Sequence, residues 1–359
     1  MRVVIAPDGF GGTLSARQAA SAIADGWRST RPGDEVTEVP LSDGGEGFLD
    51  VVMADDDEEV ILEVAGPLGH PVEARYVMRD GSTAVIESAA ACGLALVPDA
   101  MRDPMRTTTY GVGQMLHDAI GRGARRILMG LGGSATVDGG AGALCGLGYR
   151  VTVSDGSGLK VGASDLGNVA SIEVGWAPSC DDVAVELLSD VTTVLADAAR
   201  VFGPQKGADD ATVQQLTLAL QRWADVVERD LAAGKRVRDD MGTGAAGGLG
   251  YALMAAIGAR VVPGIDAVAD LVDLDAQLDG ADIVVTGEGR LDATSAQGKV
   301  IASVTERTRS RGARVMAVVG QVGEGAPSLD DVEASAQTGP GPDPATEVSA
   351  AAARLAERV

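Results

Sequence analysis

The chain has 359 residues, a formal net charge of −23 and a hydrophobic content of 45%. A chain of this length exceeds what one hydrophobic core usually supports, so two domains are expected. The negative charge argues against nucleic acid and anionic membranes as partners, because the overall field opposes both. No apolar run approaches the roughly 20 residues that cross a bilayer. The first residues, MRVVIAP, lack a signal-peptide pattern, and a cytoplasmic protein is therefore expected.

Cysteines and histidines are few and scattered. The three cysteines have no CxxC spacing, and neither histidine lies in a HExxH frame. Buried thiols are therefore expected, and neither a zinc enzyme nor a histidine-based catalytic triad is.

Strand and helix patterns alternate along the chain, which predicts an α/β fold. Thr13-Leu14-Ser15 can cap a first helix that runs to about Trp27, directly after a buried-strand pattern at the N-terminus. The strand patterns cover residues 3–6, 60–64, 72–77, 83–87, 125–129, 283–285 and 315–319. The helix patterns cover residues 110–120, 212–231 and 300–311, with a last helix from about 345.

The strands at Val3, Ile283 and Val315 resemble one another, since each is short, valine-rich and followed by a glycine-containing loop. This similarity predicts that residues 1–60 and 280–359 form one discontinuous, Rossmann-like domain with a doubly wound parallel sheet. Residues 61–279 would form an inserted α/β domain with a mixed sheet. The active site is expected in the cleft between the two domains.

A glycine-rich loop lies near the middle of the chain. The segment GLGGSATVDGGAG, residues 130–142, follows an apolar strand pattern and precedes a helix around Ala143. Glycines let the backbone approach a ligand, and the N–H groups at the start of a helix attract anions. Asp138 within the loop would suit a phosphate that arrives with Mg²⁺. The alternative is a tight strand-to-helix connection without a ligand.

Four further glycine segments favour a site over a simple connection, because α/β enzymes build active sites from several converging loops. The segments are LSDGGEG (41–47), FGPQKGA (202–208), GAAGGLG (244–250) and TGEGRLD (286–292). The first and the last contain the carboxylates Asp43, Glu288 and Asp292.

Lysine is rare in this chain, with four lysines against 25 arginines. Two of the four, Lys206 and Lys299, lie beside glycines, where a compact ammonium could contact phosphate oxygens. The alternative is that both are ordinary surface lysines.

At this point the motifs together carry a family resemblance over nearly the whole length. They are IAPDGFGGTLSA, LSDGGEGF, GPLGHPV, AVIESAAACGL, RTTTYGVGQ, GLGGSATVDGGAG, VFGPQKGA, GAAGGLG with the later PGID, and TGEGRLDATSAQGK. The chain resembles the bacterial glycerate kinases of the two-domain type. The resemblance implies transfer of phosphate from ATP, with Mg²⁺, to a hydroxyl of D-glycerate, giving 2- or 3-phosphoglycerate. A homodimer is left open.

Phosphoryl transfer to a hydroxyl needs positioning, a metal ion, cations and a base. Asp190 matches the aspartate of the family's central segment and is the favoured base, with a helix cap or loop aspartate as the alternative. Arg290 would clamp a carboxylate or phosphate, or form only a surface ion pair, and Lys299 would act on the transferred phosphate. Asp138 and Asp292 are the expected metal ligands. The expected substrate- and phosphate-binding residues are Asp43, Gly44, Gly45, Gly132, Gly133, Ser134, Lys206, Gly287 and Glu288.

The chain departs from the family pattern at several places, including a weakly matched region after Gly320. Gly9-Phe10-Gly11-Gly12 lacks the usual serine and lysine, Val137 replaces an asparagine, and Thr192 to Leu195 replaces an Asp-Asn-Pro-Leu segment. A weakened family member that binds a nucleotide or hydroxy acid as a sensor is therefore the second hypothesis. A nicotinamide dehydrogenase is third, since PDGFGG has the wrong spacing for a dinucleotide-binding turn.

Overall fold

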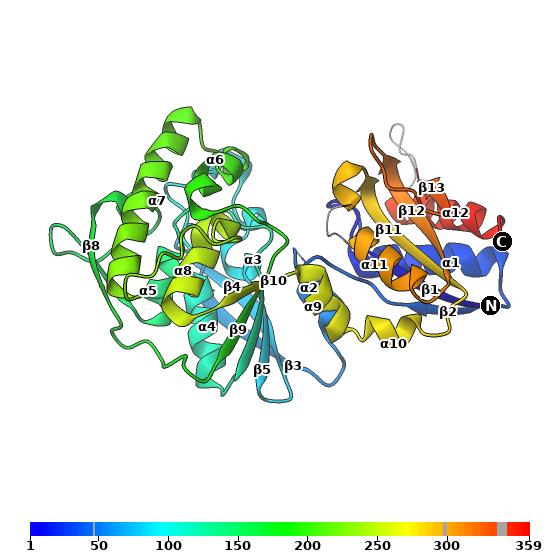
Figure 1. The fold of residues 1–359 in the computed structure, drawn as a ribbon, viewed down its shortest axis with the longest axis horizontal. Coiled ribbons are helices and arrows are strands. Elements are labelled where there is room, and N and C mark those ends of the chain that lie inside the picture. Colours follow the sequence, from blue (N-terminus) through cyan, green and yellow to red (C-terminus); the bar gives the residue numbers. More distant parts are fainter. Residues whose placement is uncertain (46, 297–299, 336–342) are drawn as a thin grey trace. The chain divides into compact units, whose positions relative to one another are not determined.

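The computed structural model describes residues 1–45, 47–296, 300–335 and 343–359, and the chain divides into two compact units (Figure 1). Unit 1 comprises residues 1–43, 50–52 and 263–359, and unit 2 comprises residues 44–49 and 53–262. These boundaries differ from those expected at residues 60 and 280. The first moves because strand β3 (Glu58–Ala65) pairs along its whole length with a strand of unit 2. The second moves because two helices before residue 280 are tied to unit 1.

Unit 1 is built on a parallel sheet in the order β13-β12-β11-β1-β2. Its strands are β1 (Arg2–Pro7), β2 (Glu35–Glu38), β11 (Ile283–Leu291), β12 (Arg314–Val322) and β13 (Asp331–Ala334). The three similar strands predicted from sequence are therefore neighbours. From β1 the sheet grows toward β2 on one side and toward β11 on the other, which makes the β1–β11 junction its topological switch point.

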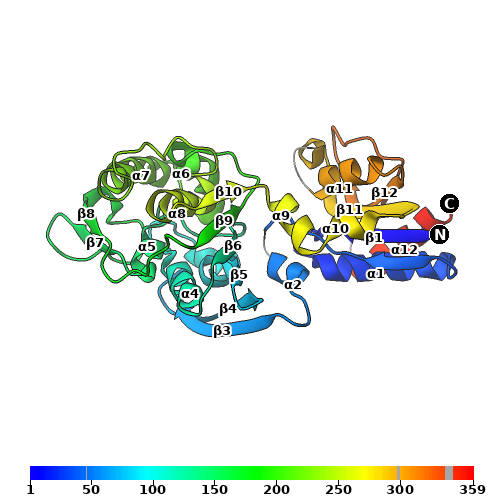
Figure 2. The ribbon, with the colours of Figure 1, turned by 60° about the horizontal axis from the view of Figure 1, so that its bottom comes forward.

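Helices cover both faces of this sheet, as a doubly wound fold requires. They are α1 (Ala16–Thr30), α11 (Val300–Arg309) and α12 (Pro344–Ala356). Figure 2 shows α1 and α12 beneath the strands and α11 above them. Alternate residues of β12 serve the two faces: Met316 and Val318 pack with α1 and α12, whereas Ala317 and Val319 pack with Ile301 of α11.

The first helix begins where the sequence predicted. Ser15 Oγ accepts a hydrogen bond from the Gln18 N–H at 3.2 Å, and the Gln18 side chain accepts one from the Ser15 N–H at 2.9 Å. This reciprocal cap satisfies two otherwise unpaired donors. Farther along, Gly26 lets α12 approach closely, because a Cβ there would lie 2.0 Å from the Ser349 carbonyl oxygen.

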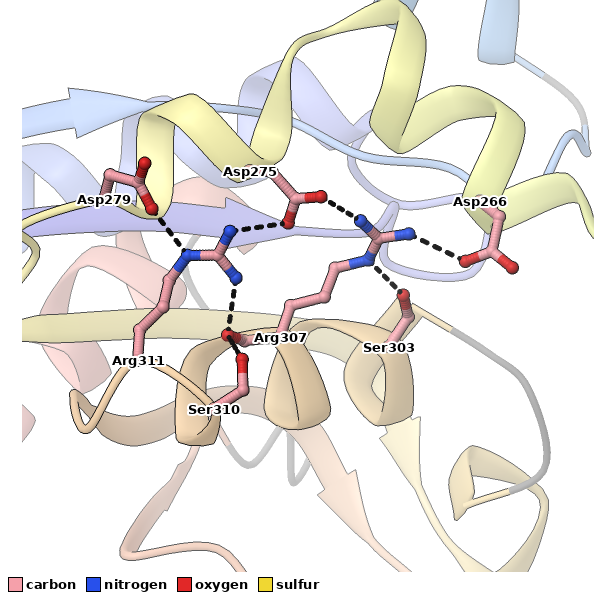
Figure 3. Close-up of polar contacts among 7 residues, drawn as sticks. All are labelled: Asp266, Asp275, Asp279, Ser303, Arg307, Ser310 and Arg311. Atoms are coloured by element: carbon pink, nitrogen blue, oxygen red, sulfur yellow. Dashed lines mark hydrogen bonds and ion pairs between the residues drawn. The ribbon is translucent and has the colours of Figure 1, made fainter.

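An ion-pair network ties α9 (Gly264–Leu271) and α10 (Leu274–Leu278) to α11 (Figure 3). Arg307 pairs with Asp266 at 2.9 Å and with Asp275 at 2.7 Å. Arg311 pairs with Asp275 at 3.2 Å and with Asp279 at 2.8 Å. These contacts explain why residues 264–278 belong to unit 1 and not to the inserted unit.

Unit 2 contains a mixed sheet in the order β10-β9-β6-β5-β4-β3. Antiparallel pairing joins β3 to β4 (Pro71–Arg79) and β4 to β5 (Thr83–Glu87). Parallel pairing joins β5, β6 (Arg126–Gly130), β9 (Ala184–Leu188) and β10 (Arg260–Val262). A separate antiparallel pair is formed by β7 (Arg150–Val153) and β8 (Val169–Glu173). The predicted class, a parallel doubly wound sheet plus an α/β part with a mixed sheet, is confirmed.

The helices of unit 2 are α3 (Ala89–Cys92), α4 (Tyr110–Gly121), α5 (Ala141–Leu147), α6 (Ala198–Phe202), α7 (Asp210–Asp230) and α8 (Leu249–Ile257). A short helix α2 (Phe48–Val52) lies at the boundary of the two units. The apolar stripe expected on α7 is core, since Leu216, Leu220 and Trp223 are fully buried. Over the described ranges, no helix is long and apolar enough to span a membrane.

The Arg307 network yields the first prediction. Arg307→Met keeps much of the side-chain volume but removes both ion pairs, so the free energy of unfolding should fall by about 1–2 kcal/mol. High salt should reduce the difference from wild type, because ionic strength screens the pairs. Arg309→Met on the same helix is the control, since Arg309 is exposed and, among the described residues, donates to the Ser328 carbonyl oxygen alone. Equal effects of the two changes in urea denaturation would contradict the assigned role.

Candidate functional site

A cavity of about 550 Å³ lies at the switch point of unit 1. The loop after β1 contributes Asp8 to Gly11 to its wall, and the far end of β11 contributes Glu288 to Arg290 and Asp292. The carboxyl ends of β1 and β11 therefore meet there, which is where open α/β sheets bind ligands.

The segment TGEGRLD, expected as a loop after Val285, is mostly strand. Gly287, Glu288 and Arg290 continue the pairing with β12 opposite Val318, Val319 and Gln321. The longer strand has a physical cause, since β12 itself extends to Val322 and offers partners beyond the end of β1. The segment thus presents its alternate side chains from a rigid strand and not from a flexible turn.

Glycines allow the backbones around this cavity to approach one another. A Cβ on Gly289 would lie 3.2 Å from the Gly11 nitrogen, and one on Gly320 would lie 2.3 Å from the Gly289 oxygen. Gly287 likewise has no room for a side chain, because its Cβ would lie 2.3 Å from the Val318 oxygen. The expected role of Gly287 in phosphate binding is thus accompanied by a packing requirement.

Three predicted site residues of β11 and its end line the cavity together. Glu288 is 9% exposed, whereas the Arg290 side chain is 64% exposed and pairs with Asp292 at 3.2 Å between Nε and Oδ2. The Asp292 side chain is 25% exposed. Solvent screens the exposed guanidinium, so this ion pair contributes little to stability. The Arg290 side chain is thus accessible at the cavity wall.

A second group of predicted residues gathers at the carboxyl edge of the parallel strands in unit 2. Gly130 ends β6 directly opposite Leu188, the end of β9, and the Leu131 N–H donates to the Leu188 oxygen at 3.3 Å. Asp190 follows two residues after Leu188 and is exposed. The segment that starts at Gly132 and the segment that contains Asp190 thus leave neighbouring strands side by side.

The first glycine segment packs against the same edge. Gly44 lies so close to β9 that a Cβ on it would be 2.9 Å from the Leu188 Cβ. Glu87, at the end of β5, accepts hydrogen bonds from the N–H groups of Gly47 at 2.9 Å and Leu49 at 3.4 Å. Glu87 therefore anchors the chain that follows Gly44 and Gly45. Asp43 immediately precedes them and is counted with unit 1.

Asp138 was expected to bind a metal ion, which requires a carboxylate that a ligand can reach, but its side chain is buried. Its carboxylate is 1% exposed and accepts hydrogen bonds from four donors. These donors are the Thr109 N–H (2.8 Å), the Thr109 hydroxyl (2.9 Å), the Gly140 N–H (3.0 Å) and the Gly142 N–H (3.2 Å). Burial raises the pKa of Asp138, while the bonds from Thr109 and the glycines oppose the rise. Three of these bonds end on Oδ2 and one on Oδ1, so the protein itself satisfies most of the acceptor capacity of this buried carboxylate.

The same contacts revise the anion site expected at the start of α5. Gly140 is the N-cap of α5, and the Ala143 N–H donates to Thr109 Oγ1 at 2.8 Å. The Ala141 N–H donates to the Asp138 carbonyl. The N–H groups of this helix start are therefore used by the protein itself. Asp138 occupies the position that was predicted for a bound phosphate.

Backbone donors remain available earlier in the loop. In the described structure, the N–H groups of Gly132, Gly133 and Ser134 have no hydrogen-bond acceptor, although the flanking Leu131 and Ala135 N–H groups are both paired. Gly133 has φ +70°, a conformation that glycine adopts without strain. Three consecutive unpaired donors at the end of a parallel strand are suited to a carboxylate or phosphate.

Lys206 lies beneath this loop and not on the surface. It is 3% exposed, and its ammonium donates to Ser134 Oγ at 2.9 Å and to the Thr136 carbonyl oxygen at 2.7 Å. Burial lowers the pKa of Lys206 to about 8, with Cys92 and Asp138 acting in the opposite direction. Two of the three ammonium donors of Lys206 are thus used by the protein, and its contact with phosphate stays a prediction.

Two further expectations concern Lys299 and a metal-binding cluster. Lys299 lies outside the described residues, so its phosphate role stays a prediction. In the described part of the chain, no group of three or more His, Cys, Asp or Glu side chains could hold a metal ion.

A larger cavity, of about 1090 Å³, lies beside Arg125, Ala184 and Arg260 at the opposite edge of the sheet in unit 2. It contains none of the predicted site residues, and its size is therefore not a guide to the chemistry.

The sequence analysis assigned no role to two side chains of this site. Thr109 and Glu87 lie in the motifs RTTTYGVGQ and AVIESAAACGL, but their partners are 29 and 40 residues away along the chain. Three consecutive threonines before a helix were the available signal, because threonine hydroxyls commonly bond to helix starts.

Two glycine-lined edges of parallel strands, supplied with carboxylates and few cations, define a class of α/β protein suited to phosphoryl transfer. Comparison with known proteins identifies the family. The sequence model of the glycerate kinase family matches residues 3–359, and the chain belongs to this family, a family of kinases.

Individual relatives agree with this result. The chain is 40% identical over 329 residues to a glycerate kinase of Halalkalibacterium halodurans, covering 90% of this chain and 86% of the relative. It is 39% identical over 328 residues to the glycerate 2-kinase of Escherichia coli, covering 90% and 86%. A solved structure designated glycerate kinase 2 from Salmonella typhimurium LT2 superposes with a TM-score of 0.86 at 39% identity, covering 100% of this chain and 98% of that one.

The contacts of Asp138 yield the second prediction. In Asp138→Asn one carboxylate oxygen becomes an amide N–H₂ that faces donors, so unfolding should become easier by about 2–4 kcal/mol. Chemical denaturation without Mg²⁺ measures this change. Asp182→Asn, on an exposed loop before β9, is the charge-matched control and should stay within about 0.5 kcal/mol of wild type. A variant with wild-type stability but weakened Mg²⁺ dependence would restore the metal-ligand role.

Proposed function

We propose that this protein catalyses ATP-dependent phosphorylation of D-glycerate, with Mg²⁺ as the metal ion. The observation that carries the proposal is the match of the family model to nearly the entire chain, from residue 3 to residue 359. The name of the E. coli relative, glycerate 2-kinase, favours the 2-hydroxyl as acceptor and 2-phosphoglycerate as product. The expected location of the active site in a cleft between two domains stays a prediction.

The nucleotide is proposed to bind in the cavity of unit 1. Support comes from its position at the topological switch point and from the glycines that keep its backbone free of side chains. Arg290 would exchange its pairing with Asp292 for a phosphate oxygen, because guanidinium groups bind phosphate through two parallel N–H donors. Lys299 is proposed to contact the transferred phosphate as a point charge.

The residues of this cavity fit Mg²⁺. Mg²⁺ usually binds through one or two carboxylates together with phosphate oxygens and waters, so a cage of three protein ligands is not required. Asp292 and Glu288 line the cavity and would supply the carboxylates. When bound, the ion would neutralise charge on the phosphates. Asp138 does not fit this role, because its oxygens already accept four hydrogen bonds.

D-glycerate is proposed to bind at the carboxyl edge of β6 and β9. The unpaired N–H groups of Gly132 and Gly133 would receive its carboxylate, and Ser134 would donate its hydroxyl. Asp190 is then the base that accepts the proton of the attacking hydroxyl, since it follows the neighbouring strand. Gly44 and Gly45 would close the same edge, because Gly44 contacts Leu188 there. Substrate binding by Asp43 stays a prediction.

A sensor without turnover is the second candidate, favoured by the missing lysine at Gly11. Gly11 has φ +48°, a left-handed conformation, and a Cβ there would meet no atom within 4 Å. A side chain would therefore find space but would adopt a conformation that costs most residues about 1 kcal/mol. Glycine relieves this strain, so its presence has a structural reason besides any loss of activity.

The proposal is tested by measuring ADP formation from ATP with purified protein. We expect ADP only when D-glycerate and Mg²⁺ are both present, and a single new phosphomonoester signal in the ³¹P NMR spectrum. Glycerate-independent hydrolysis would contradict the kinase assignment. Saturable binding of D-glycerate by calorimetry without any turnover would favour the sensor. The position of the new signal distinguishes 2-phosphoglycerate from 3-phosphoglycerate.

A further prediction concerns the proposed base. Asp190→Asn should lower kcat by about 10²-fold or more, because the hydroxyl proton loses its acceptor. The affinity for D-glycerate and the melting temperature should change little, since Asp190 is exposed. Asp181→Asn, an exposed aspartate before the same strand, is the control. An Asp190→Asn enzyme with wild-type kcat would assign the base role elsewhere.

A further inference from the structure

A buried lysine is costly, and the environment of Lys206 must compensate for it. Lys206 ends a tight turn, Pro204–Lys206, between α6 and α7, and its side chain runs past the Phe202 ring, with Nζ 5.9 Å from the ring centroid. Gly207 completes the turn at φ +98°, where a Cβ would lie 2.3 Å from the Arg102 oxygen. The turn is therefore built so that the ammonium enters the protein beneath the loop after β6.

The ammonium has two protein acceptors, and both belong to that loop. It donates to Ser134 Oγ and to the Thr136 carbonyl oxygen, at 2.9 and 2.7 Å. An ammonium carries donors only, so the Ser134 oxygen must accept from it. The Ser134 hydroxyl proton is then directed elsewhere, and no acceptor for it exists among the described residues.

Two titratable groups act on the Lys206 ammonium from the elements packed around it. Cys92 of α3 is fully buried, and burial raises the pKa of its thiol to about 12, so it stays neutral at physiological pH. Asp138 of the same loop is the negative charge, but it makes its hydrogen bonds to Thr109 and the glycines and not to the ammonium. Lys206 therefore holds residues 134–136 while Asp138 holds residues 138–142.

We infer that Lys206 is a positioning residue, which fixes the Ser134 hydroxyl as a donor toward a substrate oxygen beside the N–H groups of Gly132 and Gly133. This inference rests on the proposed binding of D-glycerate at that edge. It assigns Lys206 no contact with the substrate. The substrate class is a small hydroxy acid whose carboxylate accepts the bonds of this loop.

The arrangement carries a pH dependence whose sign follows from the hydrogen bonds. Below pH 8 the ammonium donates, and the Ser134 proton is available to the substrate. As the pH rises through the Lys206 pKa of about 8, the neutral amine can accept the Ser134 proton instead. The KM for D-glycerate should then rise above pH 8, while the KM for ATP should not follow the same profile.

The test compares wild type, Lys206→Met, Lys206→Arg, Ser134→Ala and the Lys206→Met/Ser134→Ala double variant. Lys206→Met should weaken D-glycerate binding about tenfold, and Ser134→Ala by a similar factor, since each removes one oriented donor. The double variant should bind no worse than Ser134→Ala, because Lys206 acts through Ser134. The rise in KM above pH 8 should be absent from both single variants. Lys206→Arg, which keeps the charge, should recover part of the affinity.

Lys235→Met is the matched control, because Lys235 is an exposed lysine after α7 and should leave affinity and pH profile unchanged. The melting temperature of Lys206→Met should fall, since the buried Thr136 carbonyl oxygen loses its donor and the buried Asp138 loses a nearby positive charge. If Lys206→Met does not fold, the dependence of the KM for D-glycerate on pH in Ser134→Ala still tests the positioning role of Lys206. The inference would be overturned if the losses of D-glycerate affinity in the two single variants multiplied in the double variant. It would also be overturned if the KM of Ser134→Ala for D-glycerate still rose above pH 8.

Calorimetric titration with D-glycerate separates this inference from the proposed function. A wild-type protein that turns over, with unweakened binding in Lys206→Met and Ser134→Ala, would overturn the positioning role alone. Wild-type binding without turnover would overturn the kinase activity alone, and the variants would still test the positioning role. Absence of D-glycerate binding in the wild type would overturn both.

Discussion

The bonds of one buried carboxylate organise the glycine-rich loop on which the proposed glycerate site depends. Asp138 closes the start of α5 by accepting from Thr109, Gly140 and Gly142, so the loop is held without a ligand. An internal anion at a helix start has the same electrostatic benefit as a bound phosphate. The ligand donors are consequently displaced along the chain to Gly132, Gly133 and Ser134, next to the end of β6.

In the proposed reaction the two units bind different substrates, each at the carboxyl ends of parallel strands. In each, parallel strands end at a common edge, and glycines allow the backbones there to approach one another. Unit 1 offers carboxylates and an exposed arginine around its cavity, which suits a phosphate chain with its metal ion. Unit 2 offers backbone donors and a hydroxyl that a buried lysine contacts, which suit a small carboxylate.

Much of the fold could be predicted because its signals are local. The cap at Ser15, the core stripe of α7 and the similar strands β1, β11 and β12 all follow from residue patterns within short windows. The strands β2 and β13 were not predicted, since they are four residues long and gain their stability from neighbours that lie elsewhere in the chain. The extension of β11 through the glycines was missed for the same reason, because its partner residues in β12 decide it.

For the site, sequence patterns identified the segments but not the directions of their side chains. Asp138 was read as a metal ligand and Lys206 as a phosphate contact, since an acidic residue and a lysine beside glycines suit those roles. In the structure both side chains are buried and bonded to the protein, and these contacts depend on Thr109 and Ser134, which lie 29 and 72 residues away from their partners. Such distances leave no periodic trace in a single sequence.

A crystal structure of the protein with D-glycerate and a magnesium nucleotide tests the central claim most directly. The account predicts that the glycerate carboxylate accepts hydrogen bonds from the N–H groups of Gly132, Gly133 and Ser134, with the Asp138 contacts to Gly140 and Gly142 unchanged. A ligand anion or metal ion bound at the start of α5, with Asp138 turned away from these glycines, would contradict it.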